Sequence, residues 1–382
     1  MDDTDRHRTK AVKAIAFVFK TICKMTKGYV LAQNVVFVCL VTDRFTIPVA
    51  WAFYSPDPVL KKWESEIKKL KKLSVPKSKY PKKPQRSIDY PTRIDICEDL
   101  LLDVKDLLND IKSYLRMRLP NYPDNLYIHA VVADAAYMSP EMCGYVRKIF
   151  GVNFISQLKL NQLVLINGRE VRLDNYFKEV IKTKSTMKIR NTSVEVEYAV
   201  ANLHVKSHGR ALRVIVIRYR GESSWRYTAS TDLTWRPLDI IRAYGLRWLI
   251  ETFNEDWKQY GGWGKKALQQ GDEGSFRGVI LSLLVDYFFL WHPIQVRLHQ
   301  LGQPLCTTGS LQERISVGEV TRAIETTLAQ PNPEQHLEWI KEKIEVLFKL
   351  TSSTKHAAGG LGFAYPTLED NDPGGQLTKS AA

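Results

Sequence analysis

The sequence is poor in the features that mark secreted, disulfide-bonded and membrane-spanning proteins. Its five cysteines are far apart and include no CxxC pair, which is typical of reduced thiols in a cytosolic protein and not of a disulfide framework or zinc site. Residues 1–13 are highly charged and contain no apolar core of a secretory signal. The longest apolar stretch, residues 278–291, contains Asp286 and is shorter than the roughly 20 residues that cross a bilayer. We therefore predict a buried helix there and expect no membrane association.

The chain also lacks an internal repeat, a GxGxxG fingerprint and a Walker loop, so no nucleotide cofactor is predicted. Positive charge, in contrast, is in excess. The 382 residues include 55 Lys and Arg against 41 Asp and Glu, which gives a net charge of +14. Such a surplus favours a polyanionic partner, with nucleic acid ahead of an acidic membrane surface.

Much of the surplus lies in one segment, residues 61–86, which has eleven Lys and Arg against two Glu. The first half can form a short helix, whereas prolines prevent a helix in the second half. Two interpretations stay open for this segment. It is a solvated insertion loop, or it contacts the DNA backbone, since clustered cations bind phosphates without reading sequence.

The first part of the chain has the pattern of an α/β sheet. Short β-branched and aromatic runs at 35–41 and 45–54 predict two strands joined by a tight turn, with Pro48 at an edge or a bulge. Apolar residues at helical spacing predict an amphipathic helix over 94–119.

A second strand–helix–strand unit follows. Residues 126–133 form an apolar run that ends at Asp134, a helix is predicted over about 139–150, and another strand over 153–157. Later residues change character: an Asn167-Gly168 turn and alternating apolar residues predict a β-rich insertion, and the chain after Thr234 is mainly helical.

The predicted domain organisation has five parts. They are the first part of the core (1–157, with the basic insertion 61–86), the β-rich insertion (158–232), the end of the core (233–300), a C-terminal helical region (301–350) and a disordered tail (351–382).

The most informative segment is residues 243–262, AYGLRWLIETFNEDWKQYGG. On a helix at about 100° per residue, Tyr244, Arg247, Glu251 and Lys258 share a stripe about 60° wide, and the apolar residues lie opposite. Any surface helix has a polar stripe. A carboxylate that binds a metal, flanked by cations that grip phosphates, is however typical of a phosphodiester site.

Such a site needs further carboxylates. Asp134 stands at the C-terminal end of a predicted strand, the edge at which open α/β sheets bind ligands. Asp2, Asp3 and Asp5 are candidates for a third carboxylate. Two Mg²⁺ ions prefer such oxygen ligands and would assist an in-line displacement at phosphorus.

The spacing Tyr-x2-Arg-x3-Glu-x6-Lys resembles the signature of insertion-sequence transposases of the insertion sequence four group, and the resemblance covers about residues 1–300. MDDTDRHR looks like the segment of that family's first Asp, VVADAAY at 131–137 like that of its second, and ASTDL is also family-like. The resemblance implies a DDE enzyme with a ribonuclease H-like α/β core, a mixed sheet flanked by helices, and a β-rich insertion before the last acidic residue.

The resemblance also implies roles for named residues. Asp3, Asp134 and Glu251 would be the catalytic, metal-binding triad for Mg²⁺ or Mn²⁺, two ions in all, with Asp2 as the alternative to Asp3. Tyr244, Arg247 and Lys258 would contact transposon-end phosphates and help to hold a flipped base. Trp225 would stack on a base, although a strand tryptophan is more often a core residue.

The same caution applies to Trp248 and Trp263, and His129 is interpreted as structural. The expected partner is double-stranded DNA, at the transposon ends and the target, bound by a homodimer, and the expected location is the bacterial cytoplasm.

One feature departs from the family. Only Met1 and Asp2 precede Asp3, so we expect most of the strand that carries the first Asp, and any domain ahead of it, to be absent. Two alternatives to an active transposase therefore stay open: a catalytically inactive, DNA-binding remnant, and a basic structural protein whose helix stripe is merely solvated.

Overall fold

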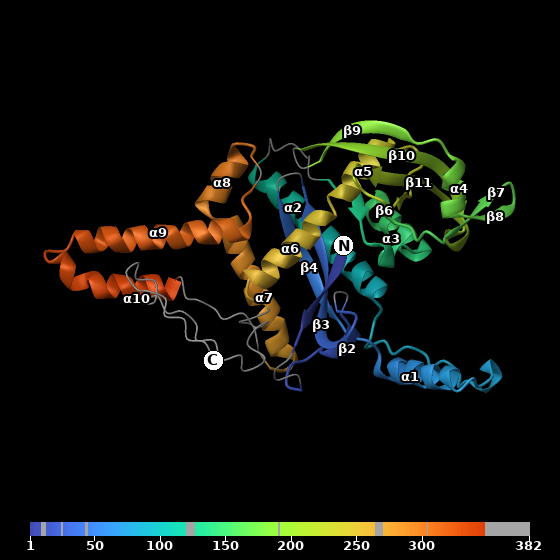
Figure 1. Cartoon of the computed structure of the whole chain (residues 1–382), viewed down its shortest axis with the longest axis horizontal. Helices are drawn as coiled ribbons and strands as arrows, with labels where there is room; N and C mark the ends of the chain where they lie inside the picture. The colour runs from blue at the N-terminus through green and yellow to red at the C-terminus, as the bar shows by residue number, and fades with distance from the viewer. Residues whose placement is uncertain are drawn as a thin grey trace, which may run out of the picture. The chain divides into compact units, whose positions relative to one another are not determined.

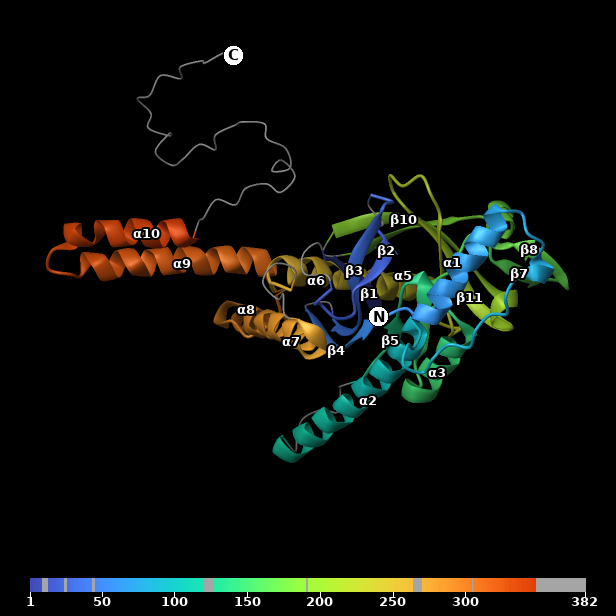
Figure 2. The same ribbon diagram turned by 90° about the horizontal axis from the view of Figure 1, so that it is seen from below.

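The computed structural model describes residues 1–8, 13–23, 26–42, 45–119, 127–189, 192–263, 270–303 and 305–347. The chain divides into two compact units, residues 1–311 and 312–382 (Figures 1 and 2). The expected tail, residues 351–382, lies outside the described residues.

The first unit begins with a four-stranded antiparallel sheet in which the long strand β3 (Tyr29–Val41) is central. It pairs with β1 (Asp2–His7), β2 (Phe19–Ile22) and β4 (Thr46–Tyr54). The strand pair predicted from the apolar runs is confirmed. Pro48 lies on the edge strand β4, opposite Cys39 where the register shifts, so the proline sits at both an edge and a bulge, where its missing N–H costs least.

Alternation along β3 builds two cores, one on each face of this sheet. Val36 and Val38 pack toward α2 (Arg93–Arg118) and α3 (Pro140–Phe150), with Val104 among their buried neighbours. On the other face, Val35 and Phe37 pack against Phe253, Trp257, Val279 and Leu283 of α6 (Trp248–Gln259) and α7 (Gly271–Leu290). The result is a helix–sheet–helix sandwich (Figure 1), because successive side chains of a strand point to opposite faces.

An eight-stranded mixed sheet forms the other half of the first unit. Its strand order is β5-β6-β12-β11-β10-β7-β8, with β9 pairing β10. The only parallel pair among the described strands joins β5 and β6. The bounds of the strands are β5 Ala130–Val132, β6 Asn153–Gln157, β7 Leu163–Ile166, β8 Arg169–Arg172, β9 Thr183–Ile189, β10 Thr192–Val205, β11 Arg210–Tyr219 and β12 Arg226–Ser230.

The predicted β-rich segment is continuous with this sheet, because β12 pairs with β6 as well as with β11. Asn167 and Gly168 both have positive φ (50° and 75°) in the turn between β7 and β8, which confirms the predicted hairpin turn. The remaining helices of the first unit are α1 (Pro58–Lys72), α4 (Leu173–Glu179), α5 (Pro237–Gly245) and α8 (Pro293–Gln300).

The predicted mixed sheet is present, and one expectation about the strands is corrected. We predicted the loss of most of the first strand. Residues 2–7 do form strand β1, which pairs with β3 over six residues. The strands nevertheless form two separate hydrogen-bonded sheets, and the amino group of Met1 donates to the carbonyl oxygen of Val132 in β5 at 2.7 Å.

The helix predicted over residues 243–262 is also corrected, because it is divided into α5 and α6 around Leu246 and Arg247. The backbone stays right-handed there, but Arg247, Leu249 and Ile250 donate to carbonyls three residues back. Such tightening gives one turn of 3₁₀ geometry. The predicted apolar face is retained, since Ile250, Phe253 and Trp257 are buried.

The apolar segment 278–291 lies mainly in α7, as predicted, but only one face of this helix is buried. Val279, Leu283 and Asp286 are buried, whereas Phe288 is 73% exposed. In the described ranges, no helix taken alone has the length and apolar composition to cross a membrane. The pair α7 and α8, bent by 54°, meets that test jointly by length and composition.

The second unit contains most of α9 (Thr308–Leu328), the 3₁₀ turn Pro333–His336 and α10 (Leu337–Leu347). Helices α9 and α10 lie side by side in both views (Figures 1 and 2). The helical character predicted for this region is confirmed.

Candidate acidic site between β1, β5 and α6

Asp134 follows β5 directly and is held by its backbone. Its carbonyl oxygen accepts from Ser156 Oγ at 2.9 Å and from the Tyr137 amide at 3.0 Å. The preceding Ala133 continues the β5–β6 pairing by donating to Ile155. The Asp134 carboxylate forms no ion pair or hydrogen bond with the part of the chain that the structure describes. A carboxylate with both oxygens unused is therefore presented at the carboxyl end of a strand, as the sequence predicted.

Strand β1 divides its acidic residues between two faces. Asp2 and Thr4 are buried on the face toward α6, whereas the side chains of Asp3 and Asp5 point the other way. This division follows from the two-residue period of a strand. Consequently only one of the two neighbouring carboxylates, Asp2 or Asp3, can face Glu251.

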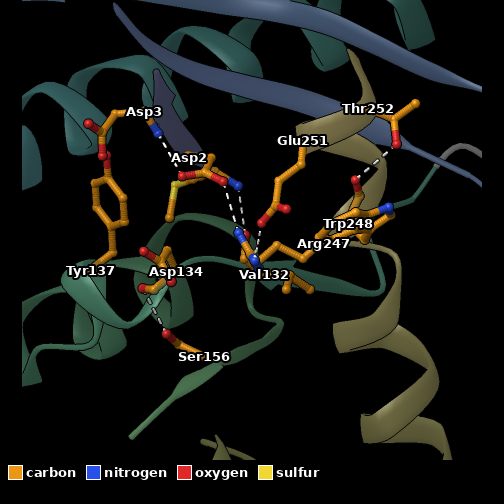
Figure 3. A network of polar contacts seen from close by, with 11 residues as sticks. Asp2, Asp3, Val132, Asp134, Tyr137, Ser156, Arg247, Trp248, Glu251 and Thr252 are labelled. Carbon is orange, nitrogen blue, oxygen red and sulfur yellow. Dashed lines mark hydrogen bonds and ion pairs between the residues drawn. The ribbon is translucent and has the colours of Figure 1, made fainter. Parts of the chain in front are cut away.

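Asp2 is the carboxylate that faces α6. Arg247 Nη1 donates to Asp2 Oδ2 at 2.9 Å, and Arg247 Nη2 donates to Glu251 (Figure 3). Both partners of the first contact are largely buried, with side chains 15% and 12% exposed. Arg247 therefore bridges two carboxylates that are far apart in the sequence, Asp2 and Glu251.

The electrostatics of the site follow from burial. Burial raises the pKa of Asp2 above its usual value, the charge of Asp134 acts in the same direction, and Arg247 and the amino terminus oppose them. Burial acts to lower the pKa of Arg247, but Tyr244, Asp2 and Glu251 together hold it above its ordinary value. These mutual effects place Asp2, Asp134, Arg247 and Tyr244 in one electrostatic cluster.

The other two residues of the sequence signature join the same site. Burial raises the pKa of Tyr244 to about 12, and the Arg247 guanidinium lies 5.8 Å from the centre of its ring. Lys258 donates to Thr4 Oγ1, two residues from Asp2 on the same face of β1. Tyr244, Arg247, Glu251 and Lys258 thus gather around Asp2 even though the helix that carries them is broken.

Asp3 lies in a separate polar network on the opposite face of β1. Its carboxylate accepts from Asn34 Nδ2 at 2.7 Å and from the Tyr137 hydroxyl at 3.2 Å, and pairs with Arg93 Nε at 3.2 Å. Asn34 also donates to Asp5 at 2.8 Å. Figure 3 shows Asp3 turned toward Tyr137 and Asp2 turned toward Arg247.

Sequence reasoning missed most of this second network. Arg93 starts a helix, as many surface cations do, and Asn34 follows Gln33 as the second of two polar residues ahead of an apolar run. Asn34 is completely buried, and no sequence pattern indicated this burial. Tyr137 was included in the family-like segment VVADAAY, but without a role.

The carboxylates of Asp2, Asp134 and Glu251 are suitable ligands for a divalent metal ion, but they are not arranged around a common point in this structure. Within the described ranges, no group of three His, Cys, Asp or Glu side chains is placed to hold a metal ion. Arg247 accounts for part of this, because its guanidinium pairs with an oxygen of Asp2 and with an oxygen of Glu251. Oxygen donors of this kind are nevertheless what Mg²⁺ and Mn²⁺ prefer.

The aromatic candidates have other surroundings. Trp225 precedes β12, packs partly on the core of the β-rich segment and lies beneath the Arg218 guanidinium at 4.4 Å. Trp263 is buried and stacks on Trp257 at 4.3 Å, so it is a core residue. Trp248 is 50% exposed at the start of α6.

His129 is an exposed residue that precedes β5 and lies 4.5 Å from the ring of Tyr127. Strand β5 is shorter than predicted and does not include it.

The fold and the site define a mixed α/β protein that gathers acidic residues of distant segments beside an arginine and a lysine. Residues 104–273 match the family model described as the transposase DDE domain. The match spans Asp134, the β-rich segment and Glu251, somewhat under half of the chain, and it supports a DDE-type transposase. No curated protein matches the chain.

Proposed function

We propose that this protein is a DNA transposase that cleaves and joins DNA strands at insertion-sequence ends, in the manner of the insertion sequence four group. One observation carries the proposal. The family match includes both Asp134 and Glu251, and Arg247 pairs with Glu251 and with a third carboxylate, Asp2 of β1, whose pKa the charge of Asp134 acts to raise.

Asp2 is the better candidate for the first acidic residue of the triad. The Arg247 guanidinium pairs with both Asp2 and Glu251, and the charge of Asp134 acts to raise the pKa of Asp2. Asp3, by contrast, is committed to Asn34, Arg93 and Tyr137. We therefore propose that Asp2 acts with Asp134 and Glu251, and that Asp3 positions β1 from the other face.

The carboxylates would hold two Mg²⁺ or Mn²⁺ ions, which supply activation of the attacking hydroxyl and stabilisation of the leaving oxygen. Arg247 contacts both Asp2 and Glu251, so metal and arginine compete for the same oxygens. When metal ions displace Arg247 from the carboxylate oxygens, its guanidinium can bind a DNA phosphate beside the site, together with Lys258 and the Tyr244 hydroxyl. Double-stranded DNA is the proposed substrate, and a homodimer on paired ends the proposed assembly.

The test is nicking of supercoiled plasmid in Mn²⁺ by the intact chain and by five single variants. Asp134→Asn and Glu251→Gln should both reduce nicking to background while DNA binding is retained, because they remove metal ligands without changing side-chain size. Glu255→Gln is the matched control, since Glu255 is exposed on the same helix one turn away. It should nick like the unmodified protein, and EDTA should abolish all activity.

The last two variants decide between Asp2 and Asp3 as the first acidic residue of the triad. Asp2→Asn should abolish nicking, and Asp3→Asn should leave measurable activity, since it changes only a network on the far face of β1. Nicking by Glu251→Gln at the rate of the unmodified chain would refute the proposed chemistry. Absence of nicking by a folded, DNA-binding chain would instead favour the inactive remnant.

A further inference from the structure

The basic segment is built as a defined arm. We call residues 58–86 the basic arm: it consists of α1, a turn, and an extended return segment with one 3₁₀ turn at Lys77–Lys79. One residue holds both of its ends. Asp57, 2% exposed, accepts from the amides of Val59 and Leu60 at the start of α1, and its other oxygen accepts from Ser87 at 2.9 Å.

The return segment covers the apolar face of α1. Leu60 and Ile67 are buried, and Trp63 Nε1 donates to the carbonyl oxygen of Pro81 at 2.9 Å. The arm therefore shields Leu60 and Ile67 in the middle of α1, whereas Val59 and Leu73 at its two ends stay exposed. Figure 1 shows α1 projecting from the lower side of the four-stranded sheet.

Lysines occupy the other face of α1. At about 100° per residue, Lys61, Lys62, Lys68, Lys69 and Lys72 fall within a sector about 120° wide, opposite Leu60, Trp63, Ile67 and Leu70. From the first to the last of these lysines the helix rises by about 17 Å, which is about half a turn of B-form DNA.

The cations of the arm are available to a partner. Ten of its eleven Lys and Arg are exposed. The exception is Lys61, which lies 4.8 Å from the ring of Phe19 and donates to the Lys20 carbonyl at 2.7 Å. Measured against the described residues, none of the ten exposed cations is in an ion pair. Only Glu64 and Glu66 oppose these charges within the arm, so a polyanion that contacts the arm lowers its electrostatic energy.

We propose that the basic arm is a second DNA contact, separate from the acidic site, which binds the phosphates of duplex DNA without regard to sequence. This inference rests on the proposed function, because it takes double-stranded DNA to be the substrate of the protein. An acidic membrane surface is disfavoured, because a helix that binds membranes buries its apolar face in the lipid, and here the return segment covers that face. Lysines, as mobile point charges, suit the sequence-independent holding of a phosphate backbone.

The experiment compares two charge-matched variants of the full chain. The arm variant replaces Lys62, Lys68, Lys69 and Lys72 by Gln, and the control variant replaces Lys112, Lys148, Lys159 and Lys178 by Gln. Binding of a random-sequence duplex is measured by fluorescence anisotropy, in EDTA, over a series of salt concentrations. Each lysine that neutralises a phosphate contributes about 0.9 to the slope of log K against log salt. The arm variant should therefore lose up to about 3.6 from this slope, whereas the control should keep it.

A charge-conserving variant tests whether a lower slope reflects the lost charge or a loss of folded structure. Replacing the same four arm lysines by Arg should retain the slope, because the charge is retained, and circular dichroism should be the same for all variants. An arm variant that matches the control in slope and affinity overturns the proposal. So does loss of binding to phosphatidylserine vesicles with DNA binding unchanged, which would assign the arm to a membrane.

These outcomes are distinguishable from failure of the proposed function. The anisotropy assay needs no cleavage, so an arm that binds DNA is detected even in a protein that does not nick. An unmodified chain without salt-dependent DNA binding would overturn both the arm and the transposase proposal. Binding with an unaltered slope in the arm variant overturns the arm alone.

Discussion

Arg247 is expected to stabilise the fold as well as the site, because removing it leaves Asp2 as a buried charge without its main partner. Asp2 and Arg247 are 12% and 15% exposed at the side chain and 2.9 Å apart. Breaking a buried pair by removing one partner typically costs about 3–5 kcal/mol. We therefore expect Arg247→Gln to lower the free energy of unfolding by about that amount at pH 7, measured by urea denaturation.

The pH dependence of this loss has a definite sign. Burial already raises the pKa of Asp2 above its usual value, and Arg247 is the largest influence that opposes the rise. Without Arg247 the pKa of Asp2 rises further. A carboxyl with a raised pKa in the folded state destabilises the fold only where it is ionised, so the deficit of Arg247→Gln should shrink as the pH falls through the window between the raised and the ordinary value.

Two comparisons make this reasoning refutable. Adding Asp2→Asn to Arg247→Gln should recover part of the lost stability, because the variant no longer buries a charge. Arg277→Gln is the matched control. Arg277 pairs with Glu273 on α7 at the same i,i+4 spacing, but both side chains are well exposed, so its loss should cost no more than about 0.5 kcal/mol. An Arg247→Gln variant as stable as the Arg277→Gln control would show that the buried pair contributes no stability.

Two further predictions concern the packing behind the site. Burial, with a contribution from Asp256, raises the pKa of Asp286 to about 7, so stability should fall as the pH rises from about 4 toward 7, by at most about 1.4 kcal/mol per pH unit. Asp286→Asn should remove this slope in urea titrations, and an unchanged slope would exclude Asp286 as its source. Gly261→Ala should lower the melting temperature, because its Cβ would lie 2.7 Å from the carbonyl oxygen of Trp257, and overpacking costs about 1–3 kcal/mol. Gly144→Ala, in open space on α3, should instead stabilise by about 0.5–1 kcal/mol; the opposite order of the two melting temperatures would contradict the packing.

Local patterns predicted most of the elements well. The strand pair β3–β4, helix α3 behind its Ser139 cap, strand β6 and the Asn167-Gly168 hairpin all follow from short-range steric and hydrogen-bonding rules. Where the predicted secondary structure was wrong, tertiary contacts determined the local conformation. The helix predicted over 243–262 breaks at Leu246 and Arg247, next to Gly245, and there the Arg247 guanidinium pairs with Asp2, at the start of the chain.

The sequence by itself determined which chemical groups are available to the site. Tyr244, Arg247, Glu251 and Lys258 are recognisable from their spacing, Asp134 from its place after an apolar strand, and the basic arm from its composition. These signals are local, because spacing on a helix and the end of a strand need no knowledge of other segments.

Only the tertiary structure decided which groups meet. Asp2 and Asp3 are neighbours in the sequence, and the resemblance favoured Asp3, yet the two-residue period of β1 sends the Asp2 carboxylate to Arg247 and the Asp3 carboxylate to Tyr137 and Arg93. The face that each carboxylate takes depends on the pairing of β1 with β3 and on the helices that cover the two faces of that sheet. Those contacts join residues far apart along the chain, and no local pattern records them.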